Sequence, residues 1–206
     1  MVYLDPDGAT WSVHRKLVPT YTERLVWGQG DGSTLVAAST PFGAVGGLIC
    51  WEHWMPLARA AMHAQHEAIH IALWPTVHDL HQLASRHYAF EGQCFVMAAG
   101  TVLSRHDVLD GIRRGGITDA GATSLLRDMR GDDSRLLMRG GSAIIGPSAE
   151  YLAGPVFDEP TILYADLDPA LITQGHLLLD STGHYARPDV FRLEVDTRPR
   201  RDVAFG

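Results

Sequence analysis

The opening residues have the pattern of a short β-hairpin. Val2–Leu4 and Thr10–Val13 are composed like strands, and the intervening Asp5-Pro6-Asp7-Gly8 is a strong turn sequence. A polar, glycine-rich loop is expected to follow over residues 15–33.

An alternation of strands and helices comes next. Strands are predicted at Thr34–Ala38 and Ala44–Ile49, and the second is apolar enough to be buried on both faces. A helix is expected from Pro56 to about His66, since proline is tolerated in a first helical turn. The later elements of this series are a strand at Ala68–Trp74, a helix at His78–Glu91 and a strand at Phe95–Ala99. Such an alternation is typical of a layered α/β domain.

Residues 107–141 interrupt this rhythm. Glycines are scattered among arginines and aspartates there, and only Leu125–Met129 is faintly helical. We expect a surface excursion within a single domain that spans residues 1–206, because no linker divides the chain. The elements predicted beyond it are strands at Ser142–Ile145, Tyr151–Leu152, Thr161–Asp166 and Val190–Val195, and a helix at Pro169–Leu179.

Composition narrows the class of protein. The 206 residues are 46% hydrophobic, which suffices for one packed domain. A net charge of -7 argues against nucleic acid as a partner, and no apolar run approaches the roughly 20 residues that span a bilayer. The first residues lack the basic and apolar regions of a secretion signal, so we expect a cytoplasmic protein. Its two cysteines, Cys50 and Cys94, do not indicate a disulfide framework.

Cys50 is the candidate nucleophile. It follows the apolar strand that ends at Ile49 and precedes the helix expected at Pro56. At such a junction, unpaired backbone N–H groups stabilise a thiolate, and the N–H of Trp51 can face negative charge that forms on a substrate. Position alone nevertheless favours an ordinary buried cysteine, which is what we expect Cys94 to be.

Longer motifs change this interpretation. The run HRKLVPTYTER at residues 14–24 is followed by WGQGDG, and GGLICWEHWMPLAR spans residues 46–59. Three later segments are WPTVHDLHQLASRHYAFEGQCFVMAAG, GGSAIIGPSAEYLAGP and GHYARPDVFRLEV. Together and in this order, the segments resemble the nitrilase branch of the carbon–nitrogen hydrolase superfamily over nearly the whole chain, apart from residues 107–141.

The resemblance implies a set of catalytic roles. Cys50 occupies the position of the nucleophile, Lys16 that of the catalytic lysine and Glu23 that of a supporting glutamate. The lysine ammonium can protonate the nitrogen of a nitrile under attack, and Glu23 can hold that ammonium in place. Without the motif, Glu23 would be interpreted as an ordinary loop carboxylate.

The residues after the nucleophile are expected to shape the substrate and oxyanion site. They are Trp51, Glu52 and His53. A Cys/His dyad is not expected from His53, because neighbouring helical residues point in different directions.

The resemblance also implies a fold and a reaction. The expected fold is the four-layer α-β-β-α sandwich of this superfamily, and family members form homo-oligomers. The implied reaction converts a small-molecule nitrile to a carboxylic acid and ammonia through thioimidate and thioester intermediates, without a metal or organic cofactor. An amidase or carbamoylase activity stays open, as do partial hydration to an amide and action on cyanide.

One catalytic residue of the family pattern has no counterpart in this sequence. The pattern places a general-base glutamate before the lysine motif, and Met1 resembles an internal methionine, so roughly the first third of the expected domain is missing. We therefore expect residues 1–206 alone to be inactive or nearly so. The alternative from another class is a non-catalytic remnant of a nitrilase-like protein.

Two weaker signals have ordinary explanations. His63, His66 and His70 have a spacing that suggests a metal site, but surface and packing roles are favoured because His70 is expected in the next strand. The three tryptophans Trp51, Trp54 and Trp74 are as compatible with core packing as with a substrate pocket.

Overall fold

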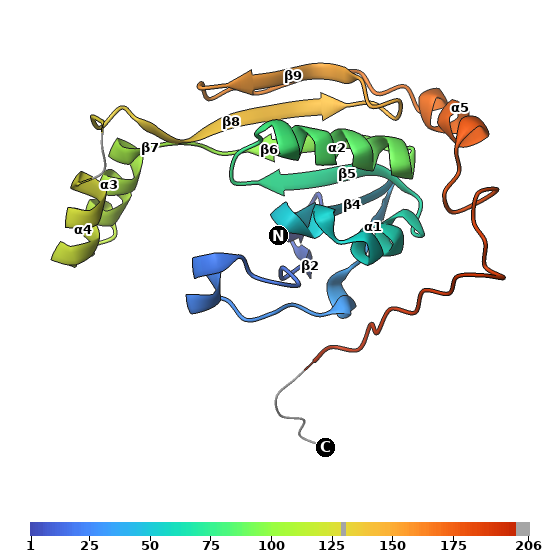
Figure 1. Cartoon of the computed structure of the whole chain (residues 1–206), viewed down its shortest axis with the longest axis horizontal. Coiled ribbons are helices and arrows are strands. Elements are labelled where there is room, and N and C mark those ends of the chain that lie inside the picture. Colours follow the sequence, from blue (N-terminus) through green and yellow to red (C-terminus); the bar gives the residue numbers. More distant parts are fainter. Residues whose placement is uncertain (129–130, 201–206) are drawn as a thin grey trace.

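The computed structural model describes residues 1–128 and 131–200, and its centre is one mixed β-sheet (Figure 1). The strand order is β3-β4-β5-β6-β8-β7, and β9 pairs with β8. The strands of this sheet are β3 (Ala38–Thr40), β4 (Gly43–Ile49), β5 (Glu67–Trp74), β6 (Phe95–Gly100), β7 (Val102–Ser104), β8 (Leu136–Ile145) and β9 (Tyr151–Phe157). A separate hairpin consists of β1 (Val2–Leu4) and β2 (Thr10–Val13).

The parallel half of the sheet confirms the predicted β–α–β–α–β series. Strands β4, β5 and β6 are parallel and are connected through α1 (Pro56–His63) and α2 (Asp79–Gly92). Helix α1 ends three residues earlier than expected. His66 adopts a left-handed backbone with φ 54°, which a continuing α-helix does not allow.

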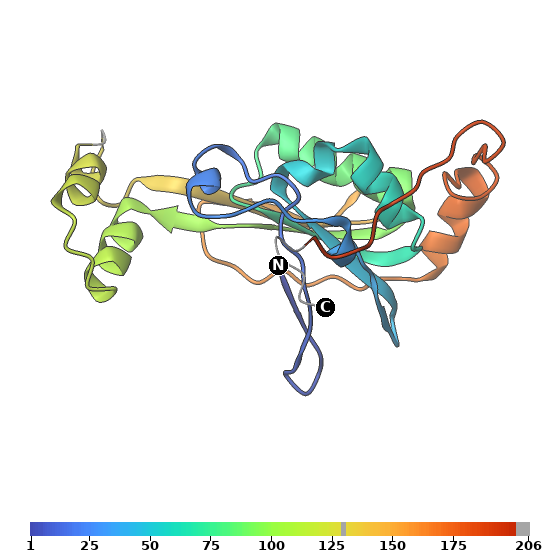
Figure 2. The same ribbon diagram turned by 90° about the horizontal axis from the view of Figure 1, so that it is seen from below.

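The core lies between this half of the sheet and its two helices. Figure 2 shows α1 and α2 on one face of the sheet, and the β1–β2 hairpin projects on the other side. Along β5, residues that face the helices, such as Ala72 and Trp74, are buried. The alternate residues Ile69, Ile71 and Leu73 are only half-buried, because no helix covers them.

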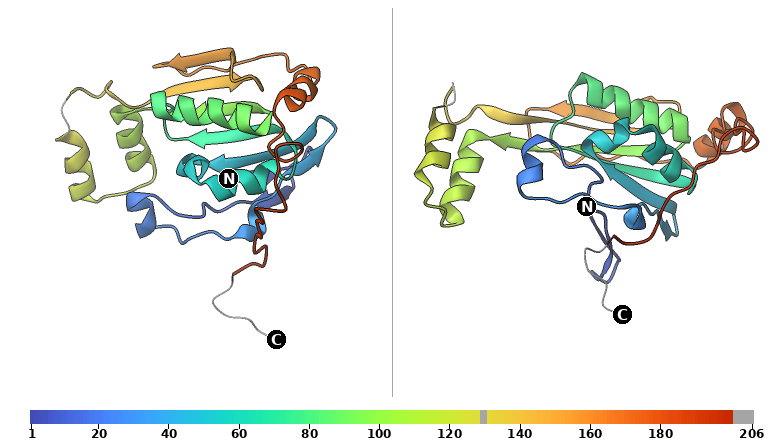
Figure 3. Two further views of the ribbon diagram at one scale, coloured as in Figure 1. Left: turned by 45° about the vertical axis from the view of Figure 1, so that its right-hand side comes forward. Right: turned by 60° about the horizontal axis from the view of Figure 1, so that its bottom comes forward.

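Residues 107–141, predicted as an irregular excursion, contain regular structure. Helix α3 (Arg105–Arg114) and helix α4 (Ala120–Arg127) contact each other and stand apart from the main sheet at the end of β7 and β8 (Figures 1 and 3). The helical signal at Leu125–Met129 marks only the end of α4, and Met129 lies outside the described residues. Strand β8 begins inside the segment, at Leu136.

Three predicted strands were misplaced or wrong. The strand expected at Thr34–Ala38 begins only at Ala38, because Asp31 caps a 3-10 turn, η2 (Gly32–Thr34). The segments Thr161–Asp166 and Val190–Val195 form no strand and lie outside every described strand pairing. Their apolar residues are mostly exposed, so alternation existed there without a partner strand. The helix expected at Pro169–Leu179 is present as α5 (Ala170–Leu178).

Among the described residues, no helix has the length and apolar character needed to cross a bilayer.

Candidate active site

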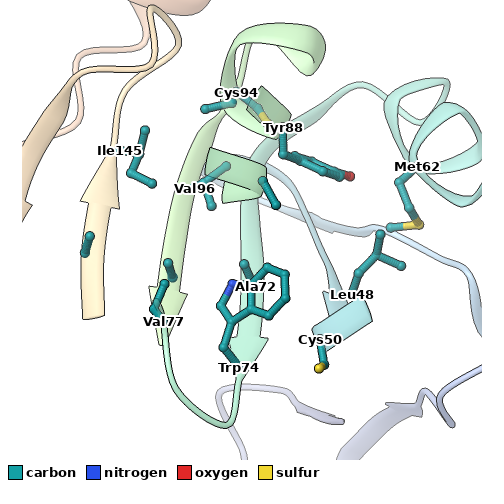
Figure 4. Close-up of a cluster of buried hydrophobic side chains, with 14 of the residues drawn as sticks. Leu48, Cys50, Met62, Ala72, Trp74, Val77, Tyr88, Cys94, Val96 and Ile145 are labelled. Atoms are coloured by element: carbon teal, nitrogen blue, oxygen red, sulfur yellow. The ribbon is translucent and has the colours of Figure 1, made fainter. Parts of the chain in front are cut away.

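The polypeptide turns sharply at the end of β4, and Cys50 stands at this turn. It begins the short 3-10 helix η3 (Cys50–Trp54), directly after Ile49. Its φ of 54° lies in the left-handed region, which costs a non-glycine residue on the order of 1 kcal/mol or more. The residue is 6% exposed, and Figure 4 shows it at the edge of the buried apolar cluster.

The lysine loop brings a buried cation to the same region. Lys16 Nζ donates a hydrogen bond to Glu23 Oε2 at 2.8 Å and another to Thr20 Oγ1 at 2.7 Å. The 3-10 turn η1 (Tyr21–Leu25) presents Glu23, whose carboxylate also accepts the Thr20 N–H at 2.6 Å. Glu23 thus contacts Lys16 in the manner expected of a supporting glutamate, and the catalytic roles of both residues stay predictions.

The electrostatics of Cys50 favour the thiol over the thiolate. Burial raises the pKa of Cys50 above its usual value, and the Lys16 charge and a hydrogen bond from the Trp51 N–H oppose this effect without overcoming it. The backbone N–H contributes as expected, but desolvation is larger. For Glu23 the balance has the opposite outcome. Burial opposes ionisation, but the hydrogen bonds from Lys16 and Thr20 keep the pKa of Glu23 below the usual value.

Glu52 joins the loop that carries Lys16 to the turn at Cys50. Its side chain is 1% exposed, and each carboxylate oxygen lies 3.1 Å from His14 Nε2. The carboxylate also accepts the backbone N–H of Leu17 and of Ile49, both at 2.7 Å. One buried side chain therefore fixes the chain beside Lys16 to the chain beside Cys50.

His53 points into the core. Its Nδ1 lies 2.7 Å from the carbonyl oxygen of Cys50, and its Nε2 lies 3.0 Å from His70 Nε2. Burial lowers the pKa of His53 well below the usual value, and the charges of His70 and Arg59 act in the same direction. The imidazole thus contacts the backbone of Cys50 and not its thiol.

Trp51, the residue after Cys50, has a side chain that faces solvent. It is 53% exposed and lines a depression of about 520 Å³ beside the turn. The complete lining is Val18, Pro19, Thr20, Tyr21, Arg24, Trp51, Glu52, Trp54 and Met55. Of the three tryptophans considered from the sequence, Trp51 and Trp54 line this depression, whereas Trp74 is buried and stacks on His53 with ring centroids 4.6 Å apart.

The histidines once considered for a metal site have packing roles. Over residues 1–128 and 131–200, no group of three or more potential ligands is arranged to hold a metal ion. His63 and His70 instead pack against the ring of Tyr88, at centroid distances of 4.4 and 3.7 Å.

Sequence reasoning missed the buried polar contacts that support the turn. Glu67, His70 and Tyr88 are joined by hydrogen bonds beneath Cys50, and His14 contacts Glu52 across 38 residues of sequence. The available signal was a histidine and a glutamate inside or next to an otherwise apolar strand, where a polar residue needs a partner.

Comparison with known proteins gives a consistent picture. The carbon–nitrogen hydrolase family model matches residues 1–176. The chain is 44% identical over 204 residues to the aliphatic nitrilase of Sinorhizobium fredii strain HH103, covering 98% of the chain and 61% of that protein. It is 39% identical over 204 residues to nitrilase 2 of Arabidopsis thaliana, covering 99% of the chain and 58% of that protein.

The fold has solved counterparts. The carbon–nitrogen hydrolase of Helicobacter pylori G27 superposes with a TM-score of 0.68 at 20% identity, over 91% of this chain and 62% of that one. This likeness concerns the α/β fold of the superfamily. The chain spans about three fifths of the length of each of these three proteins.

Proposed function

Because the chain belongs to the carbon–nitrogen hydrolase family, we propose that its cysteine turn serves nitrile hydrolysis, with Cys50 as nucleophile, Lys16 as proton donor and Glu23 as the support of Lys16. The observation that carries this proposal is the hydrogen-bonded Lys16–Glu23 pair, in which the Lys16 charge acts on the Cys50 thiol. Support for a nitrile as the substrate class comes from the nitrilase relatives that match nearly the whole chain.

The proposed reaction has two covalent stages. The Cys50 sulfur attacks the nitrile carbon, one C–N π bond breaks, and the nitrogen takes a proton from Lys16 to give a thioimidate. Water adds to this carbon, ammonia leaves, and a thioester remains on Cys50. A second water then cleaves the C–S bond and releases the carboxylic acid and the free thiol.

Lys16 is suited to this step by its hydrogen bonds. An ammonium has three N–H donors, and two of them are directed to Thr20 and Glu23. The third is available to the substrate nitrogen, whose negative charge develops only during attack. Stabilisation that appears only then accelerates the reaction.

The thiol and the waters also require a base. The carboxylates of Glu23 and Glu52 both act electrostatically on Cys50, but Glu23 is bonded to Lys16 and Glu52 to His14 and two backbone N–H groups. Neither carboxylate is free to take a proton. We therefore expect residues 1–206 alone to release ammonia from nitriles very slowly, even though the Cys50 sulfur can attack a nitrile once it is deprotonated.

Covalent labelling tests the function without requiring turnover. The chain is incubated with an activated aliphatic nitrile above the pKa of the thiol, quenched with acid and measured by intact mass spectrometry, with ammonia assayed in parallel. We expect a nitrile adduct on Cys50, absent in Cys50→Ala and retained in Cys94→Ala, and reduced in Lys16→Met by roughly tenfold or more.

Other results would favour other functions. Labelling by amides but not by nitriles would favour an amidase or carbamoylase, and labelling by neither would favour a non-catalytic remnant. Rapid ammonia release that depends on Cys50 would overturn the expectation of slow turnover while supporting the nitrilase function. An amide among the products would indicate partial hydration.

A further inference from the structure

A continuous row of buried polar groups leads from helix α2 to the nucleophile turn. Tyr88 Oη lies 2.5 Å from Glu67 Oε2, and Glu67 Oε1 lies 2.9 Å from His70 Nδ1. His70 Nε2 lies 3.0 Å from His53 Nε2, and His53 Nδ1 lies 2.7 Å from the Cys50 carbonyl oxygen. All four side chains are at least 96% buried, so water does not compete for these contacts.

The contact between His53 and the Cys50 carbonyl oxygen determines which nitrogen atoms of the two histidines carry a hydrogen. A carbonyl oxygen only accepts, so His53 must carry its proton on Nδ1. His53 is neutral because it is buried, contacts no carboxylate and has Arg59 donating to its own carbonyl oxygen at 3.0 Å; burial lowers its pKa accordingly. The His53 Nε2 is therefore a lone pair, and the facing Nε2 of His70 must be the donor.

The same reasoning continues to the other end. Glu67 and His70 share the proton that lies between Oε1 and Nδ1, and Tyr88 donates its hydroxyl hydrogen to the second oxygen of Glu67. The direction of donation is therefore fixed from His70 Nε2 to His53 and from His53 to the Cys50 carbonyl oxygen, whereas the proton between Glu67 and His70 belongs to both groups.

We propose that Tyr88, Glu67 and His70 form a hydrogen-bond chain that orients His53, and that His53 is a positioning residue for the peptide group between Cys50 and Trp51. This inference rests on the proposed role of Cys50 as nucleophile. It adds residues from β5 and α2 that do not contact the thiol.

The held peptide group is the one that matters for the thiol. Its carbonyl accepts from His53, and its N–H, which belongs to Trp51, acts to lower the pKa of the Cys50 thiol. A hydrogen bond at the carbonyl end polarises the peptide and strengthens donation at the N–H end. The bond also offsets the cost of the left-handed φ at Cys50, because a relaxed turn would move the carbonyl away from the imidazole.

Packing keeps the imidazole rings in line. His53 stacks on Trp74 at 4.6 Å, and His70 stacks on Tyr88 at 3.7 Å. Gly46 leaves the space for the Glu67 carboxylate, since a Cβ on Gly46 would lie 1.9 Å from Glu67 Oε1. The rings therefore have little freedom to adopt another hydrogen-bond pattern.

Nuclear magnetic resonance of ¹⁵N-histidine-labelled full chain tests the direction of the hydrogen bonds. We expect His53 to show a protonated Nδ1 and an unprotonated Nε2 from about pH 6 to pH 8, and His70 to show a protonated Nε2. Assignment would use the His53→Asn and His70→Gln spectra. A His53 that carries its proton on Nε2, or on both nitrogens, would refute the proposed direction of the hydrogen bonds.

Alkylation of Cys50 by iodoacetamide, followed by peptide mass mapping, tests the positioning role. We expect His53→Leu to slow alkylation at neutral pH by roughly fivefold, the effect of one lost hydrogen bond, and to shift the pH–rate profile upward. His53→Asn, whose amide N–H can replace Nδ1–H, should restore the rate to within about twofold of the wild type.

His63→Asn is the matched control for a merely structural effect. His63 is a buried histidine that also packs on Tyr88, but its hydrogen bond is to Glu91, which is not part of the proposed hydrogen-bond chain. Equal slowing by His63→Asn and His53→Leu, or no rescue by His53→Asn, would refute the positioning role. If His53→Leu does not fold, the resonance test and the Asn variant still decide the matter. None of these readouts needs nitrile turnover, so a negative nitrile assay would count against the proposed function alone.

Discussion

At the scale of single residues, Glu52 is the best example of a side chain whose role lies in its partners. Four contacts converge on one buried carboxylate, two from His14 and two from backbone N–H groups. A carboxylate offers acceptors in all these directions, whereas an amide offers one acceptor oxygen and an NH₂ that would face a donor.

We predict that Glu52→Gln destabilises the fold by about 1–3 kcal/mol, because at least one buried N–H loses its acceptor. The comparison is Glu23→Gln, which changes a half-exposed carboxylate and should cost less than about 1 kcal/mol. Urea unfolding of both variants measures the difference. Equal losses would mean that Glu52 does not hold the two segments together.

The sequence motif was sufficient to predict that Glu23 contacts Lys16. It was not sufficient to predict what Glu52 and His53 contact. Those contacts depend on His14 and His70, whose positions are set by the packing of the lysine loop and of β5 against the turn. No local periodicity reports such a long-range arrangement, and the net rise in the pKa of Cys50 has the same origin in tertiary burial.

At the scale of secondary-structure elements, the close approach of β4 to β5 depends on a glycine. Gly46 pairs with His70 across the two strands, and its missing side chain leaves room for Glu67. A Cβ there would also come within 2.8 Å of Met62 Cε. The Glu67 carboxylate cannot move aside without losing its hydrogen bonds to His70 and Tyr88.

Gly46→Ala should therefore destabilise the protein by about 1–3 kcal/mol through overpacking. Gly111→Ala should have the opposite effect, a gain of about 0.5–1 kcal/mol, since Gly111 lies inside α3 with open space around it. Thermal unfolding followed by circular dichroism gives both signs in one experiment. An unchanged stability of Gly46→Ala would show that the space between β4 and β5 can accommodate a methyl group.

The central elements could be predicted because each has its own strong pattern, as in the apolar β4 and the proline-started α1. The wrong strands at Thr161–Asp166 and Val190–Val195 had such a pattern but no partner. Strand formation requires a hydrogen-bonded neighbour, which a single segment cannot reveal. The helices α3 and α4 were obscured by their glycines, which lower helix propensity without preventing a helix.

At the scale of the whole molecule, the sheet is covered unequally. Leu48 on β4 faces α1 and is fully buried, whereas Leu73 on the neighbouring β5 belongs to the half-buried residues of the other face. The two leucines lie one strand apart, so they compare the two faces directly.

We predict that Leu48→Ala costs about 2–5 kcal/mol in urea unfolding and that Leu73→Ala costs about 1 kcal/mol. A cost for Leu73→Ala as large as that for Leu48→Ala would contradict the one-sided core. It would mean that the open face is covered in solution, as in the homo-oligomer expected from the family, and sedimentation velocity on the same samples would detect that assembly.

The position of strand β8 bears on how this molecule tolerates insertions and deletions in α3 and α4. Its first half forms a ribbon with β7 that carries α3 and α4, and its second half lies beside β6. Two strands, β5 and β6, separate β8 from β4, the strand that directly precedes Cys50. Helices α3 and α4 are therefore attached to the sheet through the β7–β8 ribbon, away from β4. We expect insertions or deletions within α3 and α4 to disturb the β7–β8 ribbon and to leave the geometry around Cys50 unchanged.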